Sequence, residues 1–149
     1  MTRKGVFFLS VLLFIFSLPG ALNAQCKQFA KNTCKPGLSP YQHDGNYDAA
    51  ALLVEGEVAE MYKTFHSDID YRIGVCSSNN LSPIHFKVMH PMTREVYYDN
   101  SEHDFDWKWD LKLESSQQLM IEVTVPVSDE NADVPEEGCV TVMIGAMDF

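Results

Sequence analysis

Apolar and polar residues alternate along most of the second half of the chain, a pattern typical of β-strands with one buried face. The clearest example runs from Phe105 to Leu113, where five apolar residues alternate with charged ones. The same period appears at 71–75, 84–88, 119–125 and 140–144. Short strands separated by turn residues predict a mainly β protein, an antiparallel β-sandwich of about seven or eight strands.

Residues 48–65 depart from this alternation. Their apolar residues follow a helical spacing, and strong helix formers make up much of the segment. Gly56 stands in the middle, where glycine costs a helix about 1 kcal/mol relative to alanine. The pattern therefore allows a helix within 48–65 and leaves the choice between helix and strand open.

The first 24 residues have the parts of a secretory signal peptide. Arg3 and Lys4 precede an apolar stretch from Val6 to Leu18, and a segment of small residues ends at Ala24. This stretch is shorter than the roughly 20 apolar residues of a membrane-spanning helix. We therefore expect cleavage after residue 24 and a mature chain without a transmembrane segment. That chain is expected to be exported and soluble, in the periplasm or outside the cell.

The rest of the chain divides into two parts. Residues 25–48 contain Pro36 and Pro40, which interrupt any helix, so we expect an irregular N-terminal arm tethered by disulfides. Residues 49–149 carry the strand pattern and are expected to form a single β-sandwich domain.

All four cysteines, Cys26, Cys34, Cys76 and Cys139, lie after the expected cleavage position. An even number of cysteines in an exported protein predicts two disulfides. Three pairings are possible. One joins Cys26 to Cys34 within the arm, and the other two attach the arm to the sandwich by cross-pairs.

Composition and charge exclude some classes of function. The chain has 11 basic and 21 acidic residues, for a net charge of -10. Cleavage of the signal peptide would remove Arg3 and Lys4 and make the charge -12. Nucleic-acid binding needs a concentrated basic surface, and anionic membranes attract the same charge, so neither is an expected partner.

Motifs for catalysis are absent from the sequence. It contains no Gly-x-Ser-x-Gly and no His-Glu-x-x-His, and its five histidines are scattered. We therefore expect no enzymatic activity, and a secreted hydrolase is only the third interpretation.

A short acidic run is the best candidate for a metal site. Asp44, Asn46 and Asp48 alternate, and Glu55 falls where the last ligand of a calcium-binding loop would lie. Oxygen-bearing side chains at alternate positions can converge on one Ca²⁺ ion. Ala49 occupies the position where such loops have glycine, and the alternative is a set of solvated turn residues. Apart from this possible Ca²⁺, no cofactor is expected.

Trp107 and Trp109 are the candidate ligand platform. In a regular strand the two side chains share one face. Exposed, they would stack against a sugar ring; buried, they would belong to the sandwich core, which the continuous alternation favours.

Several short runs resemble the strands of small exported bacterial β-sandwich domains. These runs are Glu55-Gly56-Glu57, Tyr62-Lys63-Thr64-Phe65, Asp70-Tyr71-Arg72-Ile73, Val96-Tyr97-Tyr98-Asp99-Asn100 and Gly138-Cys139-Val140-Thr141-Val142. Such domains include the pre-peptidase C-terminal type and relatives in bacterial envelopes. The resemblance implies that 57–65 is a strand, that 67–69 is a turn, and that the role is a non-catalytic accessory or binding one.

The sequence thus predicts an exported, non-catalytic binding or structural module of the cell envelope. Its partner would be a protein or a glycan of the envelope. The alternative is a calcium-dependent or carbohydrate-binding module.

Overall fold

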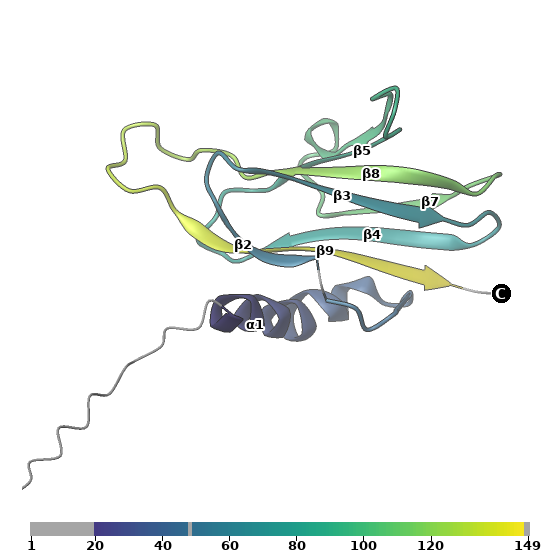
Figure 1. The fold of residues 1–149 in the computed structure, drawn as a ribbon, viewed down its shortest axis with the longest axis horizontal. Helices are drawn as coiled ribbons and strands as arrows, with labels where there is room; N and C mark the ends of the chain where they lie inside the picture. Colours follow the sequence, from purple (N-terminus) through teal and green to yellow (C-terminus); the bar gives the residue numbers. More distant parts are fainter. Residues whose placement is uncertain (1–19, 48, 148–149) are drawn as a thin grey trace, which may run out of the picture.

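The computed structural model describes residues 20–47 and 49–147, with side chains from residue 24 onward. Within these residues, nine strands form two antiparallel sheets that stack face to face, and a helical segment packs beneath one of them (Figure 1). The prediction of a mainly β, antiparallel sandwich is confirmed. None of the described helices is long and apolar enough to span a membrane.

Sheet A contains β1 (Gln42–His43), β2 (Ala50–Val54), β4 (Asp70–Ser77), β7 (Lys108–Lys112) and β9 (Glu137–Met147). Its strand order is β1-β9-β4-β7, and β2 pairs with β9 on the side that β1 also occupies. Sheet B contains β3 (Val58–Phe65), β5 (His85–Met89), β6 (Val96–Asp99) and β8 (Gln117–Thr124), in the order β3-β8-β5-β6.

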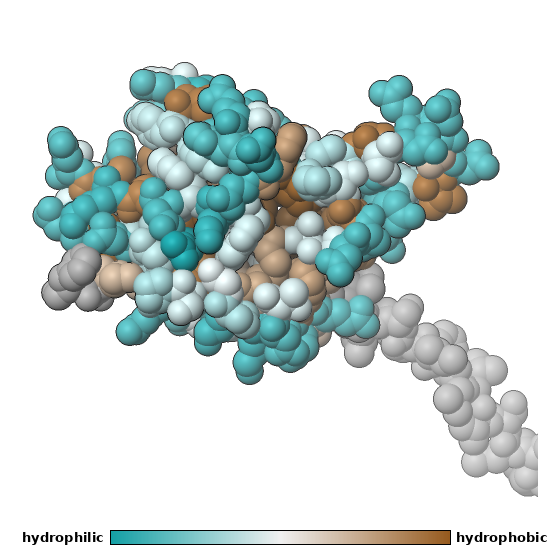
Figure 2. Space-filling view, turned by 180° about the vertical axis from the view of Figure 1, so that it is seen from behind, coloured by the Kyte–Doolittle hydropathy of each residue, from teal (hydrophilic) through white to brown (hydrophobic). Residues whose placement is uncertain are grey.

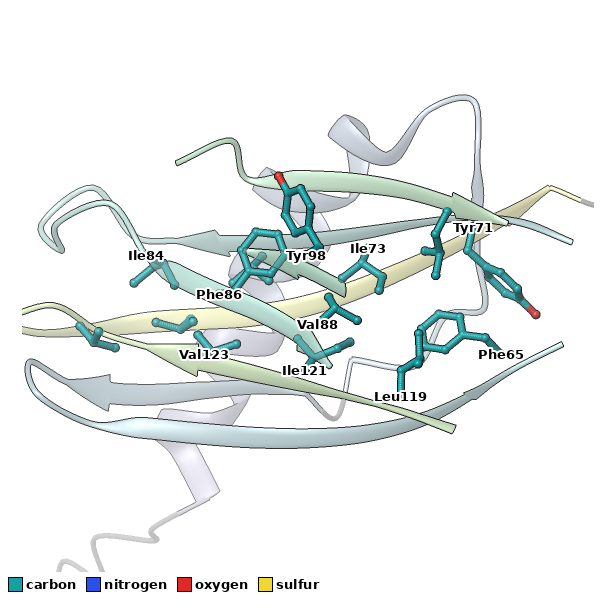
Figure 3. Close-up of a cluster of buried hydrophobic side chains, with 14 of the residues drawn as sticks. Phe65, Tyr71, Ile73, Ile84, Phe86, Val88, Tyr98, Leu119, Ile121 and Val123 are labelled. Carbon is teal, nitrogen blue, oxygen red and sulfur yellow. The ribbon is translucent and has the colours of Figure 1, made fainter. Parts of the chain in front are cut away.

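The core lies between the two sheets (Figure 3). Alternate residues of each strand point inward, so that Ile73 of sheet A and Val88 and Ile121 of sheet B are fully buried. At one end Phe65 meets Tyr71 edge to face, with ring centroids 5.0 Å apart. This arrangement explains the period of two along the sequence.

The N-terminal arm is helical up to Leu38, so the prediction of an irregular arm is wrong for this part. Helix α1 (Gly20–Phe29) continues into a π-helical turn, η1 (Ala30–Cys34), and a 3-10 turn, η2 (Lys35–Leu38). Pro36 stands at the start of the last turn, where its missing N–H has no intrahelical partner to lose. Residues 1–19 of the predicted signal peptide lie outside the described residues, and its cleavage stays a prediction.

Two disulfides attach the arm to the outer face of sheet A. Cys26 of α1 is bonded to Cys139 of β9, and Cys34 of η1 to Cys76 of β4. The structure therefore has one of the two cross-pairings, and the local Cys26–Cys34 pair is not formed. A second small core, which includes Leu38 and Met143, is buried between the arm and the sheet.

Residues 50–65 form two strands, so the possible helix is not found in the described part of 48–65. β2 ends at a turn in which Gly56 has a φ of +86°, a conformation that glycine adopts at little cost. β3 follows in the other sheet. The strand and the turn at 67–69 that the family resemblance implied are both present, with Asp68 at a φ of +64°.

The strand expected from Phe105 begins only at Lys108. Asp104 and Phe105 have φ values of +54° and +55°, so the chain is not extended there. The buried side chain of Asn100 holds this bend, because its amide nitrogen donates to the carbonyls of Ile84 (2.9 Å) and Asp106 (3.2 Å). The alternation of apolar and polar residues therefore begins at Phe105, before the strand itself begins at Lys108.

The disulfide pattern can be tested directly. We expect a non-reducing proteolytic digest to contain linked peptides for Cys26–Cys139 and Cys34–Cys76. The loops they close span 113 and 42 residues. In the chain-entropy model, removal of either disulfide lowers the free energy of unfolding by about 4 to 5 kcal/mol. A Cys26–Cys34 peptide in the digest would contradict the arrangement of the arm.

Candidate functional site

One long edge of the sandwich is open. Sheet A ends there in β1 and β2, and sheet B ends in β3. Strands β1 and β2 lie one after the other along β9 and are separated by residues 44–49. The edge of sheet A is therefore interrupted midway.

A cleft of about 470 Å³ enters the sandwich at this edge. We call it the inter-sheet slot. Its apolar walls come from four strands and comprise Ala51, Leu53, Ala59, Met61, Ile121, Val123, Val140, Val142 and Ile144. The remaining lining residues are His43, Asp44, Asn46, Ala49, Glu60, Tyr62 and Lys63.

The slot leaves part of the apolar interior accessible. Val142 and Ile144 follow the inward alternation of β9, yet they are only half-buried, as is Met61 across the slot. Ile121, farther in, is fully buried. Cores of globular domains are normally close-packed, so these accessible side chains distinguish the open edge from the rest of the core.

The two ends of the slot differ in chemistry. At one end lie Leu53, which pairs with Gly138 of β9, and Ala59. At the other end lies His43, which pairs with Gly145, together with Asp44 and Lys63. The slot is therefore apolar toward the 55–57 turn and polar toward the C-terminal end of β9.

His43 is the buried polar group at this end. Its side chain is only 2% exposed and packs against the Tyr47 ring at 4.8 Å. The Nδ1 atom accepts a hydrogen bond from the Gly45 N–H (3.0 Å), which assigns the ring proton to Nε2. Burial lowers the pKa of His43, so the ring is neutral at pH 7.

Lys63 is the basic group at the same end. On β3 it belongs to the inward series of Ala59, Met61 and Phe65, and its side chain is 43% exposed. Its Nζ lies 4.0 Å from Oδ2 of Asp44, the outer limit of an ion pair. An ammonium group therefore stands at the polar end of a slot whose walls are aliphatic.

A clamp outside the slot fixes the segment that leads into β1. The Arg72 guanidinium donates to both carboxylate oxygens of Asp110, at 2.6 and 2.7 Å, and to the Ser39 carbonyl at 3.0 Å. It also lies 4.5 Å from the centre of the Tyr41 ring. The hydrogen bonds from Arg72 lower the pKa of Asp110, so this clamp stays ionic at neutral pH.

The described residues of the set proposed for calcium, Asp44, Asn46 and Glu55, are not gathered in one place. Asp44 Oδ1 accepts a hydrogen bond from the Asn46 N–H (2.8 Å), as in a common turn, and Asp48 lies outside the described residues. Glu55 instead accepts hydrogen bonds from Ser128 and from the Glu136 N–H (3.3 Å).

The separation follows from the register on β9. The strand partners of His43 and Val54 are Gly145 and Glu137, eight residues apart, so about 26 Å of strand separates Asp44 from Glu55. In the part of the chain that the structure describes, no three His, Cys, Asp or Glu side chains are grouped to hold a metal.

The two tryptophans do not form one platform. Trp109 stacks on Tyr98, with ring centroids 4.9 Å apart. Trp107 lies instead against Gly37 and Gly74, where an added Cβ would be 2.6 and 2.7 Å from the indole. The prediction that both side chains share a face fails because β7 begins only after Trp107.

Trp107 and Phe105 line a second, smaller hollow of about 300 Å³ beside the Cys34–Cys76 disulfide. A carbohydrate site would thus involve Trp107 without Trp109.

Figure 2 shows the side of the molecule behind the view of Figure 1, where hydrophilic residues predominate and hydrophobic ones gather around a hollow near the centre.

One side-chain cluster contains a serine, a histidine and an aspartate, but does not connect them in the order of a catalytic triad. Asp99 Oδ1 lies 2.8 Å from Nε2 of His85 and accepts a hydrogen bond from the Ser101 hydroxyl at 2.6 Å. The carboxylate stands between the serine and the histidine, so His85 is not placed to activate the hydroxyl. Burial raises the pKa of Asp99, but the hydrogen bonds from Ser101 and His85 outweigh it and hold the value at about 2. The cluster stabilises the turn after β6.

Comparisons with known proteins identify no family. No protein-family model matches the chain, and no curated protein matches it significantly. Among solved structures, the chain is similar to Aeromonas hydrophila PliG, described as a periplasmic lysozyme inhibitor of g-type lysozyme. The TM-score is 0.48 with 16% sequence identity, over 66% of this chain and 82% of that one. The resemblance to pre-peptidase C-terminal domains is not supported by these comparisons.

Calcium binding can be tested by thermal unfolding. Because Glu55 lies far from Asp44, we expect the oxidised protein to melt at the same temperature in EDTA and in millimolar calcium. A ligand at 100 times its Kd would add about 2.7 kcal/mol, or several degrees. A calcium-dependent increase that is lost in Asp48→Ala would show that this loop binds the ion through another set of ligands.

Proposed function

We propose that this protein is an exported, non-catalytic binding module and that the inter-sheet slot is its ligand site. The observation that carries the proposal is the set of interior residues, Met61, Val142 and Ile144, that remain half-buried around a cleft of about 470 Å³. A small apolar ligand would complete the burial of these side chains. The predicted signal peptide supports export.

The size and lining of the slot support a small-molecule ligand. Ligand pockets are clefts of about 300 to 1,000 Å³ with mostly apolar walls and a few polar groups that orient the ligand. The slot has aliphatic walls and polar groups at one end. A cleft of about 470 Å³ between aliphatic walls has room for a single hydrocarbon chain.

The groups that line the slot favour binding over catalysis. Among its described lining residues there is no serine, threonine or cysteine that could act as a nucleophile. Tyr62 carries a hydroxyl, and it donates to Glu60 (2.8 Å). That hydrogen bond raises the pKa of the Tyr62 phenol, so the hydroxyl is protonated at neutral pH.

The proposed ligand site can be tested by placing a larger side chain on one wall of the slot. Ala59 faces the slot, and its neighbour Val58 is 56% exposed on the other face of β3. We expect Ala59→Phe to weaken the binding of decanol at least tenfold and Val58→Phe to leave it unchanged, as measured by titration calorimetry. Ala51→Leu, on the opposite wall, is a smaller change that should also weaken binding.

A series of alkanols adds a second criterion. Each methylene transferred into the slot should contribute about 0.8 kcal/mol, so affinity should rise about fourfold per carbon from octanol to decanol. The proposal fails if the native protein binds no alkanol, or if folded Ala59→Phe and Ala51→Leu both bind like the native protein.

A further inference from the structure

The polar end of the slot indicates the class of ligand. We propose that the slot binds a single-chain amphiphile with a carboxylate head, which Lys63 holds at the mouth while the chain lies toward Leu53. This inference rests on the proposed function, because it specifies the chemistry of the ligand at the same site.

Lys63 stands at a position where an apolar residue is expected. It occupies an inward-facing place on β3, where the other members of the series are Ala59, Met61 and Phe65. Charged groups are rarely turned toward an apolar interior unless a partner compensates them. Asp44 is at the limiting distance of 4.0 Å, and an ammonium group has three donors. A carboxylate head inside the mouth would supply a closer partner.

His43 places a second donor at the same end. Its Nδ1 is already engaged with the Gly45 N–H, so Nε2 carries the proton. The nearest carboxylate oxygen, Oδ1 of Asp44, is 3.8 Å away, beyond hydrogen-bond distance. Because the ring is buried and lines the slot, its N–H is available to an acceptor that enters with the ligand.

The acidic residues at the mouth are partly compensated. The protein is strongly acidic, but Glu60 at the rim accepts the Tyr62 hydroxyl and lies 3.1 Å from Arg94, which is also 3.8 Å from Glu122. Asp44 is 58% exposed, with one oxygen turned to the Asn46 N–H. The ion pair between Asp44 and Lys63 can therefore break when a ligand binds, because the Asp44 carboxylate remains hydrated.

The length of the slot sets the length of the chain. The stretch in which β3 and β9 both line the slot runs from Ala59 to Lys63 on β3 and from Val140 to Ile144 on β9. Four residue steps along a strand cover about 13 Å. An extended hydrocarbon of roughly ten carbons has this length, given carbon–carbon bonds of about 1.5 Å. All the wall residues are aliphatic, which favours a flexible chain over a flat aromatic ring.

The experiment compares ligands with the same chain and different heads. Decanoate, decanol and decylamine are titrated into the oxidised protein at pH 8 and low salt, below their micelle concentrations. We expect decanoate to bind about tenfold more tightly than decanol, and decylamine no more tightly than decanol. Lys63→Gln should lower the affinity for decanoate to that for decanol and leave decanol binding unchanged. Lys31→Gln removes the same charge from the exposed arm and should change neither affinity.

The outcomes separate this inference from the proposed function. If decanoate and decanol bind equally and Lys63→Gln has no effect, the slot binds the chain alone and the inference is overturned. Tighter binding of decylamine would identify Asp44 as the head-group partner and overturn it as well. If Lys63→Gln self-associates through β3 but binds decanoate normally, Lys63 only protects an edge strand and the inference fails. If no ligand binds, the proposed function itself is wrong.

Discussion

Strand β9 has apolar residues on both of its faces, and the architecture depends on covering both. Val140, Val142 and Ile144 point toward sheet B, while Cys139 and Met143 point toward the N-terminal arm. A strand that is apolar on both faces needs a layer on each side. Sheet B supplies one layer, and the disulfide-bonded arm supplies the other. The arm is thus a third layer of the domain.

The same strand determines where the slot lies. One long side of β9 is paired with β4. The other carries β1 and β2 with a gap between them, which ends at Ala49, whose carbonyl accepts a hydrogen bond from the Val142 N–H (3.1 Å). The gap leaves Val142 and Ile144 half-covered on their inner face and puts His43 and Asp44 beside them. The Arg72 clamp, which holds Ser39 and Tyr41 just before β1, fixes this polar end. The pairing of β9 therefore determines both which of its apolar residues are covered and where the slot opens.

Much of the fold could be predicted from the sequence because most strands bury one face. The alternation at 71–75, 84–88, 119–125 and 140–144 reappears as β4, β5, β8 and β9. The helical spacing at 48–65 misled because two short strands lie in opposite sheets and change phase at Gly56. The prolines of the arm do not exclude a helical segment, because Pro36 stands at the start of a turn, where proline is tolerated. Alternation does not predict the side of the sheet on which Trp107 lies, because it continues where the backbone at Phe105 is not extended.

The site was less accessible to prediction than the fold. The slot arises where an edge strand is interrupted, and periodicity does not show which strands form the edges of a sheet. One signal was present: Lys63 interrupts the inward series of β3, and a charge at such a position indicates either a protected edge or a polar ligand. Asp44 and Asn46 of the acidic run do lie at the slot, but Glu55 belongs to the opposite end, about 26 Å along β9. Spacing along the chain could not show this separation.

The proposed site requires that a ligand enter between the two sheets at the open edge of the sandwich. Methyl NMR spectra recorded while decanoate is added to the oxidised protein test it most directly. We expect the methyl signals of Met61, Val142 and Ile144 to shift together and saturate, while those of Val88, in the closed part of the core, stay unchanged. Shifts confined to surface methyls such as Met92 and Val134, or no shifts at all, would contradict it.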